Sequence, residues 1–235
     1  MILQIETATT VCSVALAQDG QVLAFKQVDE RNIHAEVITV FIAELLAANG
    51  ITYAQLDAIA VSCGPGSYTG LRIGVSTAKG LCYALDKPLI AIETLESMAQ
   101  GVIDNAMPLQ LSTFNSQPST LLLCPMIDAR RMEVYTAIFN TNGEQLKPTA
   151  AEIIDGDSFN DLLKTNTILF FGDGAEKCRD VLGTNPNAKF LTGFTNSATY
   201  LTKKAAEKFL AKDFEDVAYF EPYYLKDFIA GKKSH

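Results

Sequence analysis

Histidine is scarce in this sequence, which limits the metal chemistry available to the chain. There are two histidines, His34 and His235, and they lie far apart. A helical metal site of the two-histidine kind places them one turn apart, because residues at i and i+4 share a face. That spacing does not occur here, and a Ser/His or Cys/His nucleophile pair has only His34 available. We therefore predict no catalytic residue and no metal site, and we assign His34 to a helix cap or an interface.

A glycine-rich segment is the next candidate for chemistry. GPGSYTG lies between a predicted strand at Ala58–Ser62 and a predicted helix over about Thr69–Leu85. Backbone N–H groups at such a helix entrance can hold a phosphate. The segment lacks the GK[ST] ending of a P-loop and the GxGxxG spacing of a dinucleotide site. Two interpretations remain, a tight turn followed by close helix packing or a weak nucleotide site, and both use Gly64, Gly66, Ser67, Gly70 and Gly74.

Acidic residues offer a sparse version of a phosphoryl-transfer site. Glu6 lies on the first predicted strand, and Asp173 lies in the turn Gly172-Asp-Gly174. Such enzymes need acidic residues for Mg²⁺ and loops that hold phosphate. One isolated carboxylate is not a general acid/base pair. An autonomous ATPase or small-molecule kinase with weak nucleotide binding is therefore the alternative function, while Asp128 and Arg130 are expected to form an ion pair in a turn.

Charge and cysteine content exclude other classes. The net charge is −8, whereas tight nucleic-acid binding needs Lys and Arg to displace counterions, so another protein should supply most of any RNA contact. Five widely spaced cysteines without a CxxC pair argue for buried thiols rather than a disulfide framework or a zinc knuckle. No apolar run reaches the roughly 18 residues of a membrane helix, and the start has no basic n-region. We expect no membrane association and a cytoplasmic location.

Strands and helices alternate along the chain, which predicts a mixed α/β fold. Strands at 2–6, 11–17 and 21–28, with a turn at Asp19-Gly20, precede a helix over His34–Asn49. A strand at 89–92 and a helix at 94–102 lead to the polar, proline-containing stretch 104–119, a predicted linker. The second half is predicted to hold strands at 121–127, 133–140 and 167–171 and helices near 158–164, 175–182 and 197–211. We predict two lobes, 1–104 and 105–235, and the last segment is a candidate to pack back on the first.

Two helices carry more apolar or small surface than one sheet face can cover. Polar residues occupy only a narrow sector of helix 34–49, although a helix on a single sheet normally shows a polar outer face. In helix 69–85, a small residue recurs every fourth position at Gly70, Gly74 and Ala78, which permits a tight helix crossing. Exposed apolar surface of this size marks an interaction site. We predict a partner interface made by His34, Val37, Ile38, Phe41, Leu45, Thr69, Leu71, Arg72, Val75 and Lys79.

The segment GPGSYTGLRIG resembles the signature GPGSFTGLRIG of the bacterial TsaB (YeaZ) family. Further segments follow in the family's order, namely ILQIETATTVCSVAL, NIHAEVI, DARRMEVY, GDGA and EPYYLK, so the resemblance covers essentially the whole chain. The sequence departs from the pattern at Glu6, where the family usually has Asp, and at Tyr68 and Lys226, where Phe and Arg are common. These changes keep charge or shape.

The resemblance implies an actin-like, ribonuclease H-like fold with two lobes and a role in making threonylcarbamoyladenosine in tRNA. The family is a paralogue of the transferase TsaD, and its members pair with TsaD and with the ATPase TsaE. A non-catalytic scaffold follows, which binds no cofactor by itself, leaves ATP and metal to the partner subunits and reaches tRNA through the complex. Because the paralogue shares the fold, we also expect a homodimer through the same face when the chain is alone.

Overall fold

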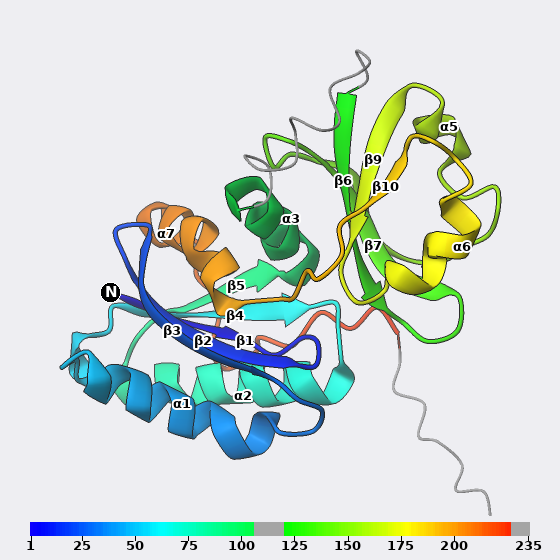
Figure 1. Ribbon diagram of the computed structural model, residues 1–235. Helices are drawn as coiled ribbons and strands as arrows, with labels where there is room; N and C mark the ends of the chain where they lie inside the picture. Colours follow the sequence, from blue (N-terminus) through cyan, green and yellow to red (C-terminus); the bar gives the residue numbers. More distant parts are fainter. Residues whose placement is uncertain (106–119, 227–235) are drawn as a thin grey trace, which may run out of the picture.

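The chain forms two lobes, and each is built on a five-stranded sheet (Figure 1). The computed structural model describes residues 1–105 and 120–226. The linker predicted at 104–119 lies almost wholly outside the described residues, and so does His235. The predicted α/β fold with two lobes is confirmed.

The first sheet has the strand order β3-β2-β1-β4-β5. Its strands are β1 (Ile2–Glu6), β2 (Val11–Gln18), β3 (Gln21–Asp29), β4 (Ala58–Gly64) and β5 (Leu89–Glu93). Strand β1 pairs antiparallel with β2 and parallel with β4. The predicted turn between β2 and β3 is confirmed, since Asp19 and Gly20 both have the positive φ that a tight hairpin requires.

The second sheet repeats this topology, with β6 in the place of β1. Its order is β10-β9-β6-β7-β8, where β6 and β7 pair antiparallel and β6 and β9 pair parallel. The strands are β6 (Thr120–Asp128), β7 (Glu133–Asn140), β8 (Gln145–Ile153), β9 (Asn166–Phe171) and β10 (Ala188–Phe190). The two edge strands, β8 and β10, were not predicted. Strand β8 contains a proline and β10 has three residues, so neither shows an extended β pattern.

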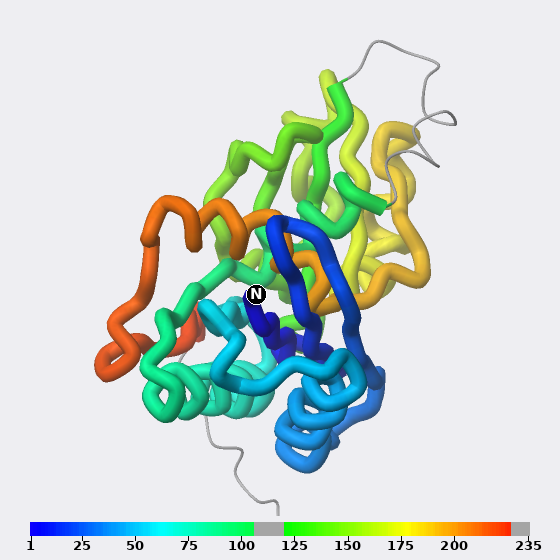
Figure 2. Tube along the Cα trace, turned by 90° about the vertical axis from the view of Figure 1, so that its left-hand side faces the viewer, coloured from blue at the N-terminus to red at the C-terminus, as the bar shows by residue number. Residues whose placement is uncertain are grey.

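Helices cover both faces of the first sheet. Helices α1 (His34–Ala48) and α2 (Tyr68–Leu85) lie side by side on one face, and α7 (Thr202–Ala211) with the preceding 3-10 turn η3 (Ala198–Leu201) lies on the other (Figure 2). Alternate residues of β1 pack into the two helical layers on either side of the sheet, because successive side chains of a strand point to opposite faces. Leu3 and Ile5 pack with α1 and α2, whereas Ile2 packs with Leu201 and Ala205.

Apart from one short turn of the first lobe, the remaining helices belong to the second lobe or join the two. Helix α3 (Thr94–Asn105) follows β5 directly and packs Leu95 and Met98 against Phe139 and Phe171 of the second lobe. The predicted helix at 175–182 is divided into the 3-10 turn η2 (Glu176–Cys178) and α6 (Arg179–Leu182). Two short elements complete the set, η1 (Tyr53–Gln55) and α5 (Asn160–Leu163).

After α7 the chain runs back along the first lobe as an irregular segment, residues 213–226, which we call the C-terminal strap. Its Glu215 N–H donates to the Leu89 carbonyl over 2.9 Å, and its Tyr223 N–H donates to the Cys63 carbonyl over 2.8 Å. Lys226, the last described residue of the strap, forms an ion pair with Glu133 of β7. The segment from η3 to the strap, which the sequence places in the second lobe, therefore lies mainly against the first.

Two further predictions can be compared with the described residues. All five cysteines are buried and free, as expected for core thiols. Among residues 1–105 and 120–226, no helix has the length and apolar character needed to cross a membrane.

Candidate functional site

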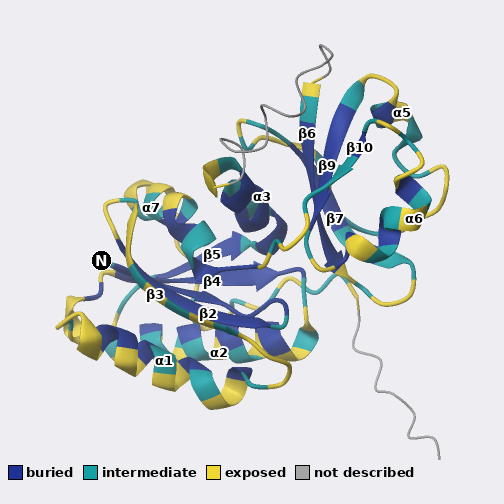
Figure 3. Cartoon of the chain, in the orientation of Figure 1, coloured by how far each residue is buried: buried dark blue, intermediate teal, exposed yellow. Residues whose placement is uncertain are grey.

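Helix α1 presents a partly apolar outer surface. Its inner residues Ile38 and Leu45 are buried in the core between the helix and the sheet. Buried and exposed residues alternate along the helix (Figure 3). Val40 on the outer side is 48% exposed, and Val37 and Phe41 are half-buried. The apolar pattern of this helix thus serves both the core and the surface.

His34 fixes the start of α1 to the sheet. Its side chain is buried, and its Nε2 lies 3.1 Å from the Val11 carbonyl oxygen of β2. The structure shows no hydrogen bond from this side chain to the helix N-terminus, so the cap role is not seen. The interface role is also wrong for this conformation, because the imidazole is enclosed by the chain's own residues.

The glycine stripe of α2 packs against the loop after β1. A Cβ atom at Gly70 would collide with the Thr7 carbonyl oxygen, one at Gly74 with Thr7 Oγ1, and one at Gly66 would lie 2.7 Å from Ala8 Cβ. The stripe was predicted to permit a close helix crossing. The close approach is present, but the neighbour is the Thr7–Ala8 loop, through backbone and side-chain atoms, rather than another helix.

Two amides at the glycine-loop entrance are engaged within the chain. The Ser67 N–H donates to the Ala8 carbonyl over 2.7 Å, and the Gly70 N–H is 3.3 Å from Ser67 Oγ, which caps α2. Gly64 lies against the strap, where a Cβ atom would meet the Tyr223 carbonyl carbon at 3.2 Å. The geometry therefore supports the tight-turn interpretation of this loop.

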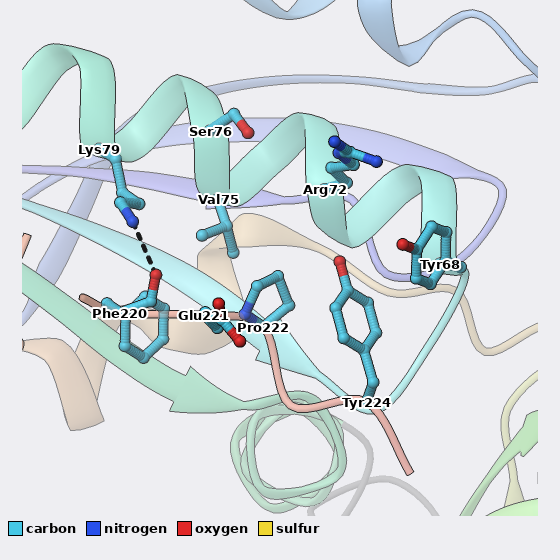
Figure 4. Close-up of a pocket in the computed structure, with 9 residues that line it drawn as sticks. All are labelled: Tyr68, Arg72, Val75, Ser76, Lys79, Phe220, Glu221, Pro222 and Tyr224. Carbon is cyan, nitrogen blue, oxygen red and sulfur yellow. Dashed lines mark hydrogen bonds between the residues drawn. The ribbon is translucent and has the colours of Figure 1, made fainter. Parts of the chain in front are cut away.

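A groove of about 450 Å³ runs between α2 and the C-terminal strap (Figure 4). The Lys79 ammonium donates to the Phe220 carbonyl over 2.7 Å and so joins the two walls. At the other end the rings of Tyr68 and Tyr224 stack with centroids 4.6 Å apart. The lining residues are Tyr68, Arg72, Val75, Ser76, Lys79, Phe220, Glu221, Pro222 and Tyr224.

The ten residues of the predicted interface divide into two groups. Thr69 and Arg72 are exposed, and Val37, Phe41 and Lys79 are half-buried, so these five are accessible to a partner. The other five have core side chains, and their prediction as interface residues is corrected here: His34, Ile38, Leu45, Leu71 and Val75 are each at most 6% exposed. Helices α1 and α2 carry apolar residues on both their inner and their outer sides. Hydrophobicity alone therefore could not tell which of these residues face the core and which face solvent.

Sequence reasoning also missed surface residues. Tyr83 near the end of α2 is 87% exposed, and Val40 of α1 is the other large apolar side chain exposed on these two helices within the described residues. The strap wall of the groove was missed as well. The EPYYLK motif was recognised there, but no periodic pattern in the sequence brings residues 220–224 beside α2.

Glu6, the carboxylate that the alternative kinase hypothesis would use, is fully buried. Its Oε1 accepts a hydrogen bond from the Ala8 N–H over 2.6 Å. Burial raises the pKa of Glu6 to about 7, and the hydrogen bond from the Ala8 N–H, together with the nearby polar side chains of Ser62 and Asn196, opposes that rise. The side chain is enclosed, so it cannot reach a solvent-borne nucleotide in this conformation.

The second acidic turn is engaged in local structure. Asp173 Oδ1 accepts from the Asp128 backbone N–H over 3.0 Å. Asp128 forms its ion pair with Lys177, not with Arg130 as expected, and Arg130 contributes only its backbone N–H to Asp128 Oδ1. Across the described part of the chain, no group of three or more His, Cys, Asp or Glu side chains could hold a metal ion.

Comparisons with known proteins identify the family to which this chain is related. The family model described as TsaD, tRNA N6-adenosine threonylcarbamoyltransferase, matches residues 30–231. The "tRNA threonylcarbamoyladenosine biosynthesis protein TsaB" of Bacillus subtilis (strain 168) is 31% identical over 236 residues, which cover 96% of this chain and 93% of that protein. The protein of the same name from Escherichia coli (strain K12) is 38% identical over 136 residues, 58% of this chain and 53% of that one, so this match spans about half of that relative.

Solved structures show the same fold. YeaZ from Pseudomonas aeruginosa aligns with a TM-score of 0.76 at 22% identity, covering 95% of this chain and 99% of that one. The sequence matches extend over nearly the full chain, and the structural match includes both sheets. The chain belongs to the TsaB (YeaZ) family.

Proposed function

We propose that this chain is a non-catalytic subunit of the system that makes threonylcarbamoyladenosine in tRNA, and that it works by docking a TsaD-type transferase. Family membership supports the biosynthetic role, since the Bacillus subtilis and Escherichia coli relatives carry that name. The docking role rests on the surface of this chain.

The observation that carries the docking proposal is the apolar surface of the paired helices α1 and α2. Val40 and Tyr83 are exposed, and Val37 and Phe41 are half-buried on the same two helices. Burying a Val or Phe side chain contributes about 1.5–3 kcal/mol. Two paired helices can supply the roughly 800 Å² per partner that a specific interface needs. We name Val37, Val40, Phe41 and Tyr83 the docking face.

Charge and chemistry support a subunit that acts through others. The net charge of −8 disfavours direct tRNA binding, so the complex would provide the RNA contact. Glu6 is enclosed and the only described histidine, His34, is held by the Val11 carbonyl. We propose that this chain binds no cofactor itself, that ATP and metal belong to the transferase and to a TsaE-type ATPase, and that the complex acts in the cytoplasm.

Calorimetric titration of the transferase into this chain tests the docking face. Val40→Asp and Tyr83→Asp place a charge on exposed positions without disturbing the core, and each should weaken binding at least tenfold. Ile153→Asp is the matched control, because Ile153 is 74% exposed but lies on β8 of the second lobe. Equal affinity for wild type and both docking-face variants would exclude this face as the binding site.

Reconstitution tests the function itself. Modification of tRNA is measured with the partner subunits, ATP and threonylcarbamoyl-adenylate, with and without this chain, and omission should abolish or strongly reduce product formation. The isolated chain is also incubated with Mg-ATP. Steady-state hydrolysis by the pure chain would favour the alternative, an autonomous actin-fold ATPase or kinase.

A further inference from the structure

A row of buried polar side chains crosses the first sheet. Glu6 of β1 pairs in register with Ser13 of β2. On the other side, Ile5 pairs with Val61 of β4, which brings Ser62 next to Glu6. All three polar side chains have 0% exposure. Their shared face is the one that η3 and α7 cover, so the row lies inside the first lobe.

This polar row holds both places where the described chain passes between the lobes. At the first, Thr94 begins α3, and its Oγ1 lies 2.8 Å from Ser62 Oγ. At the second, the chain returns from β10 to η3, and the Ala198 N–H donates to Ser13 Oγ over 3.1 Å. Phe194, just before this return, stacks edge-on against Phe171 of the second lobe. The two crossings are thus each attached to this row by a hydrogen bond.

Glu6 stands at the centre of the row with one oxygen unsatisfied. Its Oε1 accepts from the Ala8 N–H, but its Oε2 has no hydrogen-bond partner among the described residues. Asn196 lies at the second crossing, is 4% exposed, and its Nδ2 also lacks a partner among those residues. A buried acceptor and a buried donor are thus left unpaired in one contact region, at a point where the chain changes lobes.

The surroundings of Glu6 are neutral. Ser13 and Ser62 flank it from β2 and β4, and Asn196 covers it from the return crossing. The titratable neighbour on β2 is Cys12, and burial raises the pKa of that thiol to about 11, so it stays uncharged at physiological pH. An ionised carboxylate in this position is costly because the side chain is fully buried and no cationic side chain among the described residues contributes to its pKa.

We propose that Glu6 is a protonation-dependent latch on the two lobe crossings. The neutral carboxyl group leaves the crossings seated on the sheet. The carboxylate favours an opened arrangement in which residues 196–198 lift from the polar row and water reaches Glu6. This latch belongs to the chain itself and does not depend on the docking proposal.

The size of the effect follows from linkage. The carboxyl group has a pKa of about 7 when enclosed, against 4.5 for the ordinary group. Opening that hydrates the group restores the ordinary pKa, so the open population increases as pH rises from 4.5 and levels off above 7. Between pH 5.5 and 8 these values give an increase of roughly 30-fold.

Hydrogen exchange of the full chain, followed by NMR, measures this opening. The probe is the Ala198 amide, which donates to Ser13 Oγ in the closed state. After correction for the chemical exchange rate, its opening constant should rise roughly 30-fold from pH 5.5 to 8, while amides inside β7 stay unchanged. Glu6→Gln should abolish the rise, and Glu36→Gln, an exposed carboxylate on α1, should retain it.

A titration of the Glu6 carboxyl carbon in the wild-type chain keeps the proposal testable even where Glu6→Gln fails to fold. Its midpoint should lie near pH 7, and chemical shifts of amides 196–198 should follow the same midpoint. The latch is overturned by a pH-independent Ala198 opening constant, by an equal rise in Glu6→Gln, or by amides 196–198 that do not follow the Glu6 titration.

Discussion

The five cysteines illustrate how burial controls the chemistry of a side chain. Burial raises the pKa of Cys12 to about 11 and of Cys63, Cys82 and Cys124 to about 12. The thiolate is the reactive form, and at pH 8 no more than about one in a thousand of each of these four thiols would be ionised. Burial also raises the pKa of Cys178. Ellman's reagent should therefore modify the folded chain slowly and reach all five thiols only in denaturant. A rapid reaction of one thiol in the native chain would contradict its burial.

Glu6 predicts an unusual dependence of global stability on pH. Its folded-state pKa, about 7, lies above the ordinary 4.5. The stability of the neutral buried group is therefore fully present below pH 4.5 and is lost as pH rises through 7. Glu6→Gln should raise the free energy of unfolding at pH 8 by as much as about 3 kcal/mol and change it much less at pH 5.

Urea denaturation at the two pH values measures this difference, and Glu36→Gln serves as the exposed control. A Glu6→Gln variant that is less stable than wild type at pH 8 would show that the enclosed carboxylate stabilises the fold. The global measurement complements the local one, because hydrogen exchange reports the crossings and urea reports the whole chain.

At the residue scale, the sequence predicts which chemistry is available to the chain better than it predicts what surrounds each side chain. The lack of a two-histidine spacing and the core position of the cysteines were visible directly. The two sides of α1 were not, because Ile38 and Val40 are equally apolar although one is 2% and the other 48% exposed. The partner of Asp128 was also hidden, since Lys177 is distant along the chain and reaches it only through the pairing of β6 with β9.

At the scale of elements, the glycines of α2 set how closely the helix approaches the Thr7–Ala8 loop. Gly74→Ala would force its methyl group against Thr7 Oγ1, and overpacking of this kind costs about 1–3 kcal/mol. Gly80 is the matched control on the same helix, since nothing lies within 4 Å of a Cβ atom there. Gly80→Ala should instead stabilise the chain by about 0.5–1 kcal/mol, the difference in helix propensity.

Thermal unfolding of the two variants beside wild type checks the sign of each change. If Gly74→Ala lowers the stability of the chain while Gly80→Ala raises it, local packing rather than helix propensity decides the effect at Gly74. Equal stabilisation by both substitutions would mean that α2 can move away from the Thr7–Ala8 loop without loss.

Element prediction succeeded where the sequence carries clear signals for the start or the end of a helix. Helices α1 and α2 begin and end within one residue of their predicted bounds, because Ser67 caps α2 and Gly50 follows α1 at positive φ. Prediction failed at the edge of the second sheet. Edge strand β8 is exposed along much of its length, so burial does not impose a clear alternation on its sequence.

At the scale of the whole molecule, the two sheets share one topology, and this explains which part of the architecture could be anticipated. The order of elements in the two halves is similar, and the structure gives both sheets the same strand order and pairing directions. The path of the C-terminal strap could not be predicted from the sequence in the same way. Its position depends on isolated contacts, such as Tyr223 with Cys63 and Lys79 with Phe220, which have no repeating pattern.

We also predict that two copies of the chain associate through the docking face, and the dependence of their affinity on ionic strength tests this contact. Two copies of this chain each carry a net charge of −8, so their approach is opposed by long-range repulsion. Salt screens this repulsion while leaving apolar contact intact. A homodimer that buries Val40 and Tyr83 should therefore tighten as ionic strength increases, as measured by sedimentation equilibrium.

The docking-face variants separate this contact from other modes of assembly. Val40→Asp should shift the chain to monomer at every salt concentration, whereas Ile153→Asp on the second lobe should not. Adding the transferase should dissociate wild-type homodimers, because one face cannot bind two partners at once. A homodimer that persists beside bound transferase, or that Val40→Asp leaves intact, would place self-association on another surface and leave the docking face to the heterodimer alone.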